Sequence, residues 1–162
     1  IELFGRRLGI VGYGAVGRDV AAIARALGMV AVACDPFVAE ADVPLASLDE
    51  LLASSDAVSL HLPLTEATAG LIGARELGLM KPGALLVNTA RGGLVDEDAL
   101  AAALRSGALG GAALDVFAEE PPAGSPLLEL ETFVASPHAG AATSEAVGRA
   151  AGRALDLLLE AL

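Results

Sequence analysis

The sequence predicts an α/β fold, with a doubly wound, mostly parallel sheet and helices on both of its faces. Six short apolar runs alternate with segments of helical spacing from one end of the 162-residue chain to the other. Strands that are separated by helices of this length form βαβ units, whose strands run parallel. The core must be aliphatic, because 54% of the residues are hydrophobic and only 3% are aromatic. We expect one domain over residues 1–162, long enough to bury a substantial core.

The first part of the chain begins with a strand over residues 8–11, which is followed by a helix over residues 15–27. The helix is predicted because its apolar residues recur on one face at helical spacing: Val16, Val20, Ile23, Ala24 and Leu27. Gly28 predicts the end of this helix, and the second strand follows over residues 29–33. A capping-box pattern at residues 47–50 (SLDE) then predicts the start of a short helix.

The later elements are predicted in the same way. A short helix precedes the turn at residues 81–83 (KPG). The remaining strands are apolar runs, at residues 57–62, 84–87, 111–117 and 133–136. The remaining helices are a capped helix and a closing amphipathic helix, at residues 96–104 and 143–161.

Charge and cysteine content exclude several classes of function. The formal net charge of −11 argues against nucleic-acid binding, because proteins that bind nucleic acid carry basic patches. The single cysteine, Cys34, excludes an internal disulfide and a cysteine cluster for zinc, and we predict no metal site. No apolar run approaches the roughly 20 residues of a membrane span, and no signal peptide is visible. We therefore expect a cytoplasmic protein that does not bind membranes.

Residues 12–17 (GYGAVG) fit the pattern G-x-G-x-x-G, which by itself is a weak signal. Here the pattern follows a strand and opens a helix, the context that identifies a dinucleotide-binding turn of the Rossmann type. The first glycine permits a tight turn, the second lets a pyrophosphate approach the backbone, and the third lets the helix pack closely on the strand. Asp35 ends the second strand, where a carboxylate can accept hydrogen bonds from both ribose hydroxyls and would repel a 2′-phosphate. We therefore expect NAD rather than NADP, with a glycine turn and a helix-capping aspartate as the alternative.

Arg91 lies where the apolar run over residues 84–87 has ended and the chain must turn, beside Gly92 and Gly93. A guanidinium is always charged, and its planar fork of donors suits carboxylates. Ligands of open α/β sheets bind at the carboxyl ends of the strands. Arg91 is therefore a candidate anion-binding residue, although this segment alone fits a surface arginine in a loop equally well.

Four regions of the chain together resemble a known family. They are residues 8–17 (LGIVGYGAVG), 61–65 (HLPLT), 88–98 (NTARGGLVDED), and 111–121 (GAALDVFAEEP) with 136–138 (SPH). In order and spacing they resemble the NAD-binding domain of the D-isomer-specific 2-hydroxyacid dehydrogenases, the family of D-3-phosphoglycerate dehydrogenase. The resemblance covers almost the whole chain. It implies an NAD-dependent oxidoreductase that transfers a hydride between NAD(H) and a D-2-hydroxy acid or 2-keto acid, with D-3-phosphoglycerate as one candidate substrate.

The resemblance assigns catalytic roles to three residues. Arg91 would bind the carboxylate and keto oxygen of the substrate, His138 would be the general acid/base at the 2-hydroxyl, and Glu120 would pair with His138. Histidine suits this role because it titrates near the working pH, and a carboxylate partner stabilises its protonated form. Glu119 competes with Glu120, but the family's glutamate stands immediately before a proline. His61, the other histidine, is interpreted as structural or peripheral, and a loop histidine without a catalytic role remains the alternative for His138.

The cofactor contacts are predicted from the glycine turn and from the resemblance together. Asp115, at the end of the fifth strand, would contact the nicotinamide carboxamide. The predicted cofactor-binding residues are Gly12, Gly14, Ala15, Val16, Gly17, Asp35, Leu62, Pro63, Thr89, Ala90, Arg91, Asp115, His138, Gly140 and Ala141. The sequence departs from the family at Ala15, where arginine is frequent, so one charged contact to the pyrophosphate is expected to be missing. Formate dehydrogenases of the family have glutamine at the position of Glu120, so the glutamate argues against formate as the substrate.

Family members also have a second domain, which closes over the substrate and supplies most of the specificity contacts. This chain has essentially nothing before Gly5, so we expect an isolated NAD-binding domain that binds the cofactor but has little activity. Family dimers form largely through this domain, so we also expect a homodimer. The competing function is a non-enzymatic NAD(H)-sensing module like the C-terminal-binding-protein corepressors, which retain similar Arg, Glu and His residues. The acidic charge and the lack of an evident regulatory tail favour the enzyme.

Overall fold

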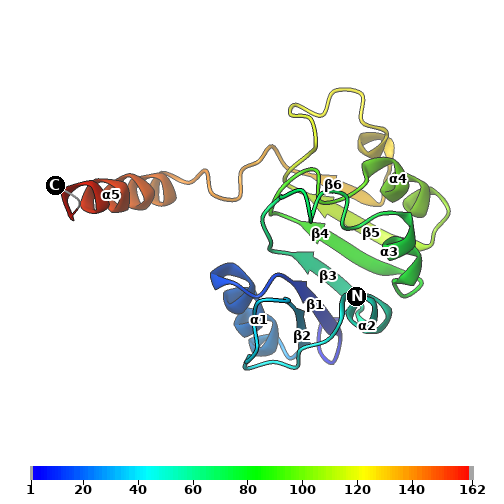
Figure 1. Cartoon of the computed structure of the whole chain (residues 1–162). Coiled ribbons are helices and arrows are strands. Elements are labelled where there is room, and N and C mark those ends of the chain that lie inside the picture. Colours follow the sequence, from blue (N-terminus) through cyan, green and yellow to red (C-terminus); the bar gives the residue numbers. More distant parts are fainter. Residues whose placement is uncertain (1, 161–162) are drawn as a thin grey trace.

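The structure is a computed structural model, which describes residues 2–160 of the chain. Six strands form one sheet in the order β2-β1-β3-β4-β5-β6, and every neighbouring pair runs parallel (Figure 1). The strands are β1 (Arg7–Val11), β2 (Val30–Cys34), β3 (Ala57–Leu60), β4 (Ala84–Asn88), β5 (Leu109–Leu114) and β6 (Phe133–Ala135). The doubly wound α/β fold predicted from the sequence is therefore confirmed.

The connections between the strands are mostly helical. Within residues 2–160 the helices are α1 (Ala15–Ala26), α2 (Leu48–Ser54), α3 (Ala74–Leu79), α4 (Glu97–Arg105), the 3₁₀ helix η1 (Pro126–Glu129) and α5 (Ser144–Glu160). The predicted capping box of α2 is present, because the Ser47 side chain accepts a hydrogen bond from the Glu50 N–H while the Glu50 carboxylate accepts one from the Ser47 N–H. No helix in the described part of the chain is both long and apolar enough to cross a membrane.

The strand order contains a remnant of one further strand beyond β2. Leu45 forms a single parallel bridge with Ala33, flanked by hydrogen bonds from the Ala33 N–H to the Pro44 carbonyl and from the Ala46 N–H to the Ala33 carbonyl, both 2.9 Å long. With Leu45 counted as a strand, the sheet has the usual order of dinucleotide-binding folds. The chain leaves β1 toward β2 on one side and later returns to pair β3 on the other side. The topological switch point, where such sheets bind ligands, therefore lies between β1 and β3.

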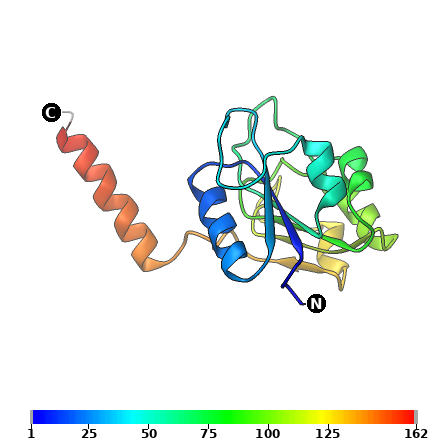
Figure 2. The ribbon, with the colours of Figure 1, turned by 90° about the horizontal axis from the view of Figure 1, so that it is seen from below.

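Helices cover both faces of the sheet, but unequally (Figure 2). Helices α2, α3 and α4 pack over one face, on a large aliphatic core that includes Leu51, Leu86 and Leu100. Helix α1 covers the other face over β1 and β2, on a smaller cluster. On that same face β4 remains half-exposed at Leu85 and Val87.

Only part of the apolar face predicted for α1 meets the sheet, because Ala24 is buried and Val20 packs against the small cluster. Val16, Ile23 and Leu27 expose 60%, 61% and 53% of their surfaces, whereas the buried residues of the helix are Gly17, Ala21 and Ala24. A helix that follows a dinucleotide-binding turn packs closely on its strand, and only small side chains permit that approach. The large aliphatic side chains therefore face outward and leave an apolar surface on α1.

Helix α5 does not close the domain as predicted. Figures 1 and 2 show that it extends away from the sheet after β6, and every side chain of α5 that the structure describes is exposed or nearly so. The helix itself forms where its amphipathic pattern predicts it. The pattern identifies which residues share a face, but it does not identify the surface that this face would cover.

Three strands end earlier than predicted. β3 ends at Leu60 rather than at residue 62, β5 covers Leu109–Leu114 rather than residues 111–117, and β6 ends at Ala135 rather than at residue 136. Leu62, Val116 and Phe117 continue the apolar runs beyond β3 and β5, but they belong to the turns that shape the carboxyl edge of the sheet. Apolar character continues past these strands because the turns are themselves partly buried.

Candidate functional site

One row of paired residues marks the carboxyl edge of the sheet. The strand pairings align Cys34, Val11, Leu60, Asn88, Leu114 and Ala135 across all six strands. The predicted site residues follow members of this row within a few positions along the chain. Because the strands are parallel, the sheet gathers these residues at one edge, where open α/β sheets bind their ligands.

The glycine turn after β1 has room for a ligand at one position only. Gly12 has φ +91°, and a Cβ there would lie 2.5 Å from the His61 carbonyl oxygen. A Cβ on Gly17 would collide with the Gly12 carbonyl oxygen. A Cβ on Gly14, in contrast, would meet no atom within 4 Å. Gly12 and Gly17 are therefore required by the fold, whereas the space beside Gly14 is open to a ligand.

The start of α1 is suited to an anion. Gly14 is the N-cap, no side chain caps the helix, and the first turn contains no acidic residue. The first N–H groups of a helix have no partner within the helix, and the positive end of the helix dipole favours negative charge there. Ala15, at the first helical position, adds no charge of its own. Backbone N–H groups would therefore hold a phosphate here.

Asp35 is held in place beside this turn by two backbone donors. The Tyr13 N–H donates to its Oδ2 at 2.8 Å and the Phe37 N–H to its Oδ1 at 2.9 Å. The half-buried carboxylate keeps lone pairs for further donors, since two oxygens can accept about four hydrogen bonds. Its position at the end of β2 suits recognition of a ribose diol.

The loop after β3 forms the other wall of the switch point. The His61 N–H donates to the Val11 carbonyl at 2.7 Å, and Leu62 lies against Gly12. The His61 imidazole is 2.8 Å from the Ser59 hydroxyl, and burial lowers the pKa of His61. The Thr68 hydroxyl closes the loop by donating to the Pro63 carbonyl at 2.8 Å.

The turn that carries Arg91 is shaped by Asn88, whose side chain is only 1% exposed. The Asn88 amide donates to the Arg91 carbonyl at 2.8 Å and accepts a hydrogen bond from the Ala90 N–H at 3.0 Å. The Arg91 side chain is exposed and bonds only to the adjacent Ala90 carbonyl among the contacts of the described residues. A Cβ on Gly92 would collide with the Phe117 carbonyl, so this turn needs a glycine after the arginine. Asn88 was not among the predicted site residues, although an asparagine at the end of an apolar run indicates a turn that needs a side-chain partner.

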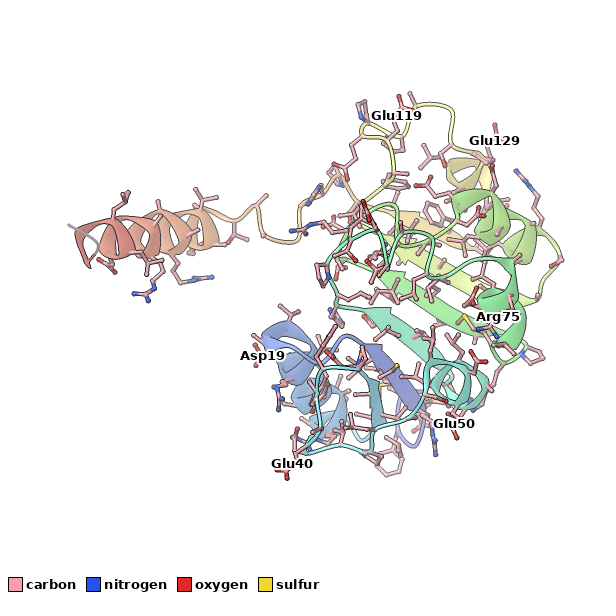
Figure 3. The ribbon with its side chains drawn as sticks, in the orientation of Figure 1. Asp19, Glu40, Glu50, Arg75, Glu119 and Glu129 are labelled. Atoms are coloured by element: carbon pink, nitrogen blue, oxygen red, sulfur yellow. The ribbon has the colours of Figure 1, made fainter. Side chains whose placement is uncertain are left out.

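The structure pairs His138 with Glu120 and not with Glu119. The His138 Nδ1 lies 3.0 Å from Glu120 Oε2, and the Phe117 N–H donates to Glu120 Oε1 at 3.1 Å. These contacts, that with His138 above all, hold the pKa of Glu120 below its usual value. Glu119 is exposed and lies on the outer part of the loop after β5 (Figure 3). If Nδ1–H donates to Glu120, Nε2 is left to exchange a proton with a ligand.

Asp115 connects the end of β5 to the loop that carries His138. Its carboxylate accepts hydrogen bonds from the Ser136 hydroxyl at 2.6 Å, the Ala139 N–H at 2.9 Å and the Gly140 N–H at 2.8 Å. The hydroxyl is the main reason that the pKa of Asp115 is lowered. These bonds fix a turn in which His138 has φ +53°. The contact of Asp115 with a nicotinamide stays a prediction. The hydrogen bonds of its carboxylate give Asp115 a second role, which is to position His138.

The remaining predicted positions belong to the same edge. Thr89 and Ala90 follow Asn88 directly, and Gly140 and Ala141 follow His138 in the turn held by Asp115. Within residues 2–160 no group of three or more His, Cys, Asp or Glu side chains is arranged to hold a metal ion. The edge thus combines open space beside Gly14, the carboxylate of Asp35, an exposed guanidinium and a histidine–glutamate pair.

Comparison with known proteins identifies relatives over nearly the whole chain. Residues 1–140 match the family model described as the D-isomer specific 2-hydroxyacid dehydrogenase, NAD binding domain. The chain is 52% identical over 154 residues to the D-3-phosphoglycerate dehydrogenase of Mycobacterium leprae, covering 92% of this chain and 29% of that protein. It is 48% identical over 168 residues to the (S)-sulfolactate dehydrogenase of Chromohalobacter salexigens, covering 99% of this chain and 54% of that protein. The chain therefore spans between about a third and about a half of the length of these relatives.

Solved structures of the same fold also match most of the chain. A D-isomer specific 2-hydroxyacid dehydrogenase from Lactobacillus delbrueckii ssp. bulgaricus, complexed with NAD, has a TM-score of 0.84 and 33% identity, and the match covers 91% of this chain and 50% of that one. An acyclic imino acid reductase in complex with NADPH has a TM-score of 0.86 and 32% identity, and covers 91% and 48%. Structures similar to this chain thus hold either form of the cofactor.

Proposed function

Since this chain belongs to the D-isomer-specific 2-hydroxyacid dehydrogenase family, as its NAD-binding domain, we propose that it binds NAD(H) at the carboxyl edge of the sheet. We further propose that it contributes Arg91, Glu120 and His138 to hydride transfer between a D-2-hydroxy acid and the corresponding 2-keto acid. The observation that carries this proposal is the His138–Glu120 pair, 3.0 Å apart, at the same edge as the glycine turn. A dinucleotide that starts at the turn reaches this pair by crossing the switch point.

The chain's own residues would handle the proton and the charge of the substrate. When bound, NAD(H) accepts or supplies the hydride at C2 of the substrate. His138 Nε2 takes the proton from the hydroxyl oxygen in oxidation and returns it in reduction. Glu120 accepts the Nδ1–H, which orients the ring and stabilises the imidazolium that forms. Arg91 binds the substrate carboxylate through its planar donors and so holds C2 beside the nicotinamide position.

Asp35 supports NAD rather than NADP as the cofactor. Its carboxylate lies at the end of β2, and the backbone N–H groups of Tyr13 and Phe37 already fix its orientation. A ribose diol offers two donors to such a group, whereas a 2′-phosphate would place like charges side by side. Among the described residues, no positively charged side chain contacts Asp35 to offset that repulsion.

The exposed stripe on α1 supports a homodimer. Val16, Ile23 and Leu27 are spaced so that they share one face of the helix, and each exposes more than half of its surface. Large apolar side chains that gather on one exposed helix face are typical of interaction sites. We propose that a second copy of the chain covers it.

The substrate proposed first is D-3-phosphoglycerate, because the Mycobacterium leprae relative that is 52% identical is named for it. We expect the 162 residues alone to bind NADH but to turn over 2-keto acids poorly. Arg91 and His138 are exposed to solvent, so water is not excluded from the reaction and the substrate carboxylate has one partner only.

The proposal is tested by fluorescence titration of the chain with NADH and NADPH, followed by a turnover screen of 2-keto acids. We expect NADH to bind at least about tenfold more tightly than NADPH, a difference of about 1.4 kcal/mol. The D35N variant should narrow this gap, because the amide keeps the shape of Asp35 but carries no charge. Tight NADPH binding by the unaltered chain would contradict the assignment of Asp35, and failure to bind either form would contradict the proposed function.

A further inference from the structure

Tyr13 has a buried side chain in the middle of the glycine turn. It lies between Gly12 and Gly14, yet its surface is fully buried in the small cluster beneath α1 and β2. The Arg18 guanidinium covers the ring at 4.8 Å from its centroid. A turn that binds pyrophosphate through its backbone has no evident need for an aromatic side chain, and the proposed function does not use this one.

The Tyr13 hydroxyl reaches a second segment of the chain, at Asp42. It donates to Asp42 Oδ1 at 2.5 Å. Arg25, near the end of α1, donates to Asp42 Oδ2 at 2.6 Å and to the Asp42 carbonyl at 2.9 Å. Asp42 is therefore held by hydrogen bonds from two elements, the glycine turn and α1. The hydrogen bond from Tyr13 is the main cause of the lowered pKa of Asp42, so the carboxylate is the charged acceptor at neutral pH.

Asp42 lies in the middle of the segment that follows Asp35. This segment leaves β2 after Cys34 and returns to it at the Leu45 bridge. At its start, the Asp35 carboxylate accepts the Tyr13 backbone N–H at 2.8 Å. One residue of the glycine turn thus contacts both the carboxylate proposed to bind the ribose and the loop that continues from it.

We propose that Tyr13 and Asp42 are a positioning pair for the adenosine end of the cofactor site. Tyr13 holds Asp35 through its backbone and residues 36–44 through its hydroxyl, so that the turn, the carboxylate and the loop keep one arrangement. Neither side chain touches the cofactor in this proposal. The inference rests on the proposed function, because it assumes that NAD(H) lies along this edge with its ribose at Asp35.

The test compares NADH and 5′-AMP binding to the whole chain and to the Y13F and D42N variants. AMP contains the adenosine end alone, and its affinity is measured by displacement of NADH fluorescence. Each variant should weaken the binding of NADH and the binding of AMP by the same factor, about fivefold. A hydrogen bond to a charged group stabilises the arrangement of the loop strongly, and part of that stabilisation contributes to the binding affinity. The Y13F/D42N double variant should bind about as tightly as the D42N single variant, since Y13F affects only the bond to Asp42, whereas D42N also weakens the contact with Arg25.

The S55A variant is the matched control. The Ser55 hydroxyl is also buried and donates to the Leu51 carbonyl at 2.6 Å, but it lies before β3, at the opposite edge of the sheet. S55A should lower the thermal midpoint without changing either affinity. Unchanged NADH affinity in Y13F and D42N would overturn the proposal, as would loss of NADH affinity without loss of AMP affinity. If the unaltered chain bound no NADH, the proposed function itself would fail, which is a distinct result.

Discussion

Asp115 is the residue on which the geometry of the proposed catalytic loop depends. It is 6% exposed, and it accepts hydrogen bonds from the Ser136 hydroxyl and from the backbone N–H groups of Ala139 and Gly140. A carboxylate at this position therefore holds the turn on both sides of His138. An asparagine could keep the bond to Ser136, but its NH₂ group would face a backbone donor.

The D115N variant should loosen this turn without unfolding the sheet. We expect the Ala139 and Gly140 amides to exchange with solvent about tenfold faster or more, because a buried donor left unpaired costs on the order of 1–3 kcal/mol. Hydrogen exchange measured by NMR checks this result. The D19N variant, on the exposed face of α1 (Figure 3), is the control and should leave these amides unchanged. Equal exchange in D115N and the unaltered chain would contradict the role given to Asp115.

The same turn should depend on pH in the acid range. The pKa of Asp115 is lowered from its ordinary value of 3.8, first by the Ser136 hydroxyl. A carboxylate whose pKa is lowered by folding stabilises the folded state above its ordinary value, and that contribution is lost as the pH falls through the lower folded value. Protection of the Ala139 and Gly140 amides should therefore stay constant from neutral pH to about pH 4 and fall below it. In D115N this step should be missing.

Sequence reasoning at the residue scale succeeded where a motif supplied the partner. Glu120 could be preferred to Glu119 because a proline follows it, and the structure pairs Glu120 with His138. Asn88 and Asp42 were missed for a different reason. Asn88 acts on the backbone of the following turn, and Asp42 meets Tyr13 across 29 positions of the sequence. A single sequence contains no signal for a pair so far apart.

Among the elements, the glycine turn and the start of α1 contain one glycine that the fold requires and another that leaves space for a ligand. Gly17 faces the Gly12 carbonyl with no room for a Cβ, whereas Gly14 faces open space. Both have φ values that ordinary residues adopt, since neither is among the residues with positive φ. Substitution by alanine therefore introduces no backbone strain at either position.

We expect G14A to impair NADH binding and G17A to impair thermal stability. G14A should keep the thermal midpoint of the unaltered chain but weaken NADH binding by about tenfold or more, because its methyl group enters the space beside the pyrophosphate. G17A should lower the thermal midpoint, because the helix must move away from the strand. Thermal unfolding and NADH fluorescence, measured on both variants, check the two results. If G14A binds NADH normally, the pyrophosphate does not lie at this turn.

The helices and strands themselves were predictable from the sequence, whereas the packing of α1 and the position of α5 were not. Each strand and helix follows its apolar period and its caps, as the capping box at Ser47 illustrates. The period included Ala24 but not Gly17 and Ala21, through which α1 also packs, because it identifies a shared face and not the neighbour of that face. For the same reason it predicted α5 as a helix but not its position away from the sheet.

On the scale of the whole molecule, the apolar stripe of α1 predicts the assembly. Light scattering should give twice the chain mass of 16.1 kDa. The I23D variant should be a monomer with an unchanged fold, because it places a charge in the centre of the proposed interface. L128D, which changes an exposed leucine of η1, should remain a dimer. A monomeric unaltered chain would refute the homodimer.

The most direct test of the proposed site is a two-dimensional NMR titration of the isotope-labelled chain with NADH. We expect the largest amide shifts directly after the row of paired residues, at Tyr13 to Val16, Asp35, Leu62, Thr89 to Arg91 and Gly140. A cavity of about 200 Å³ lies at the opposite edge, lined by residues that include Arg6, Asp56 and Lys81. Shifts concentrated around that cavity, or no shifts at the carboxyl edge, would contradict NAD(H) binding at the proposed site.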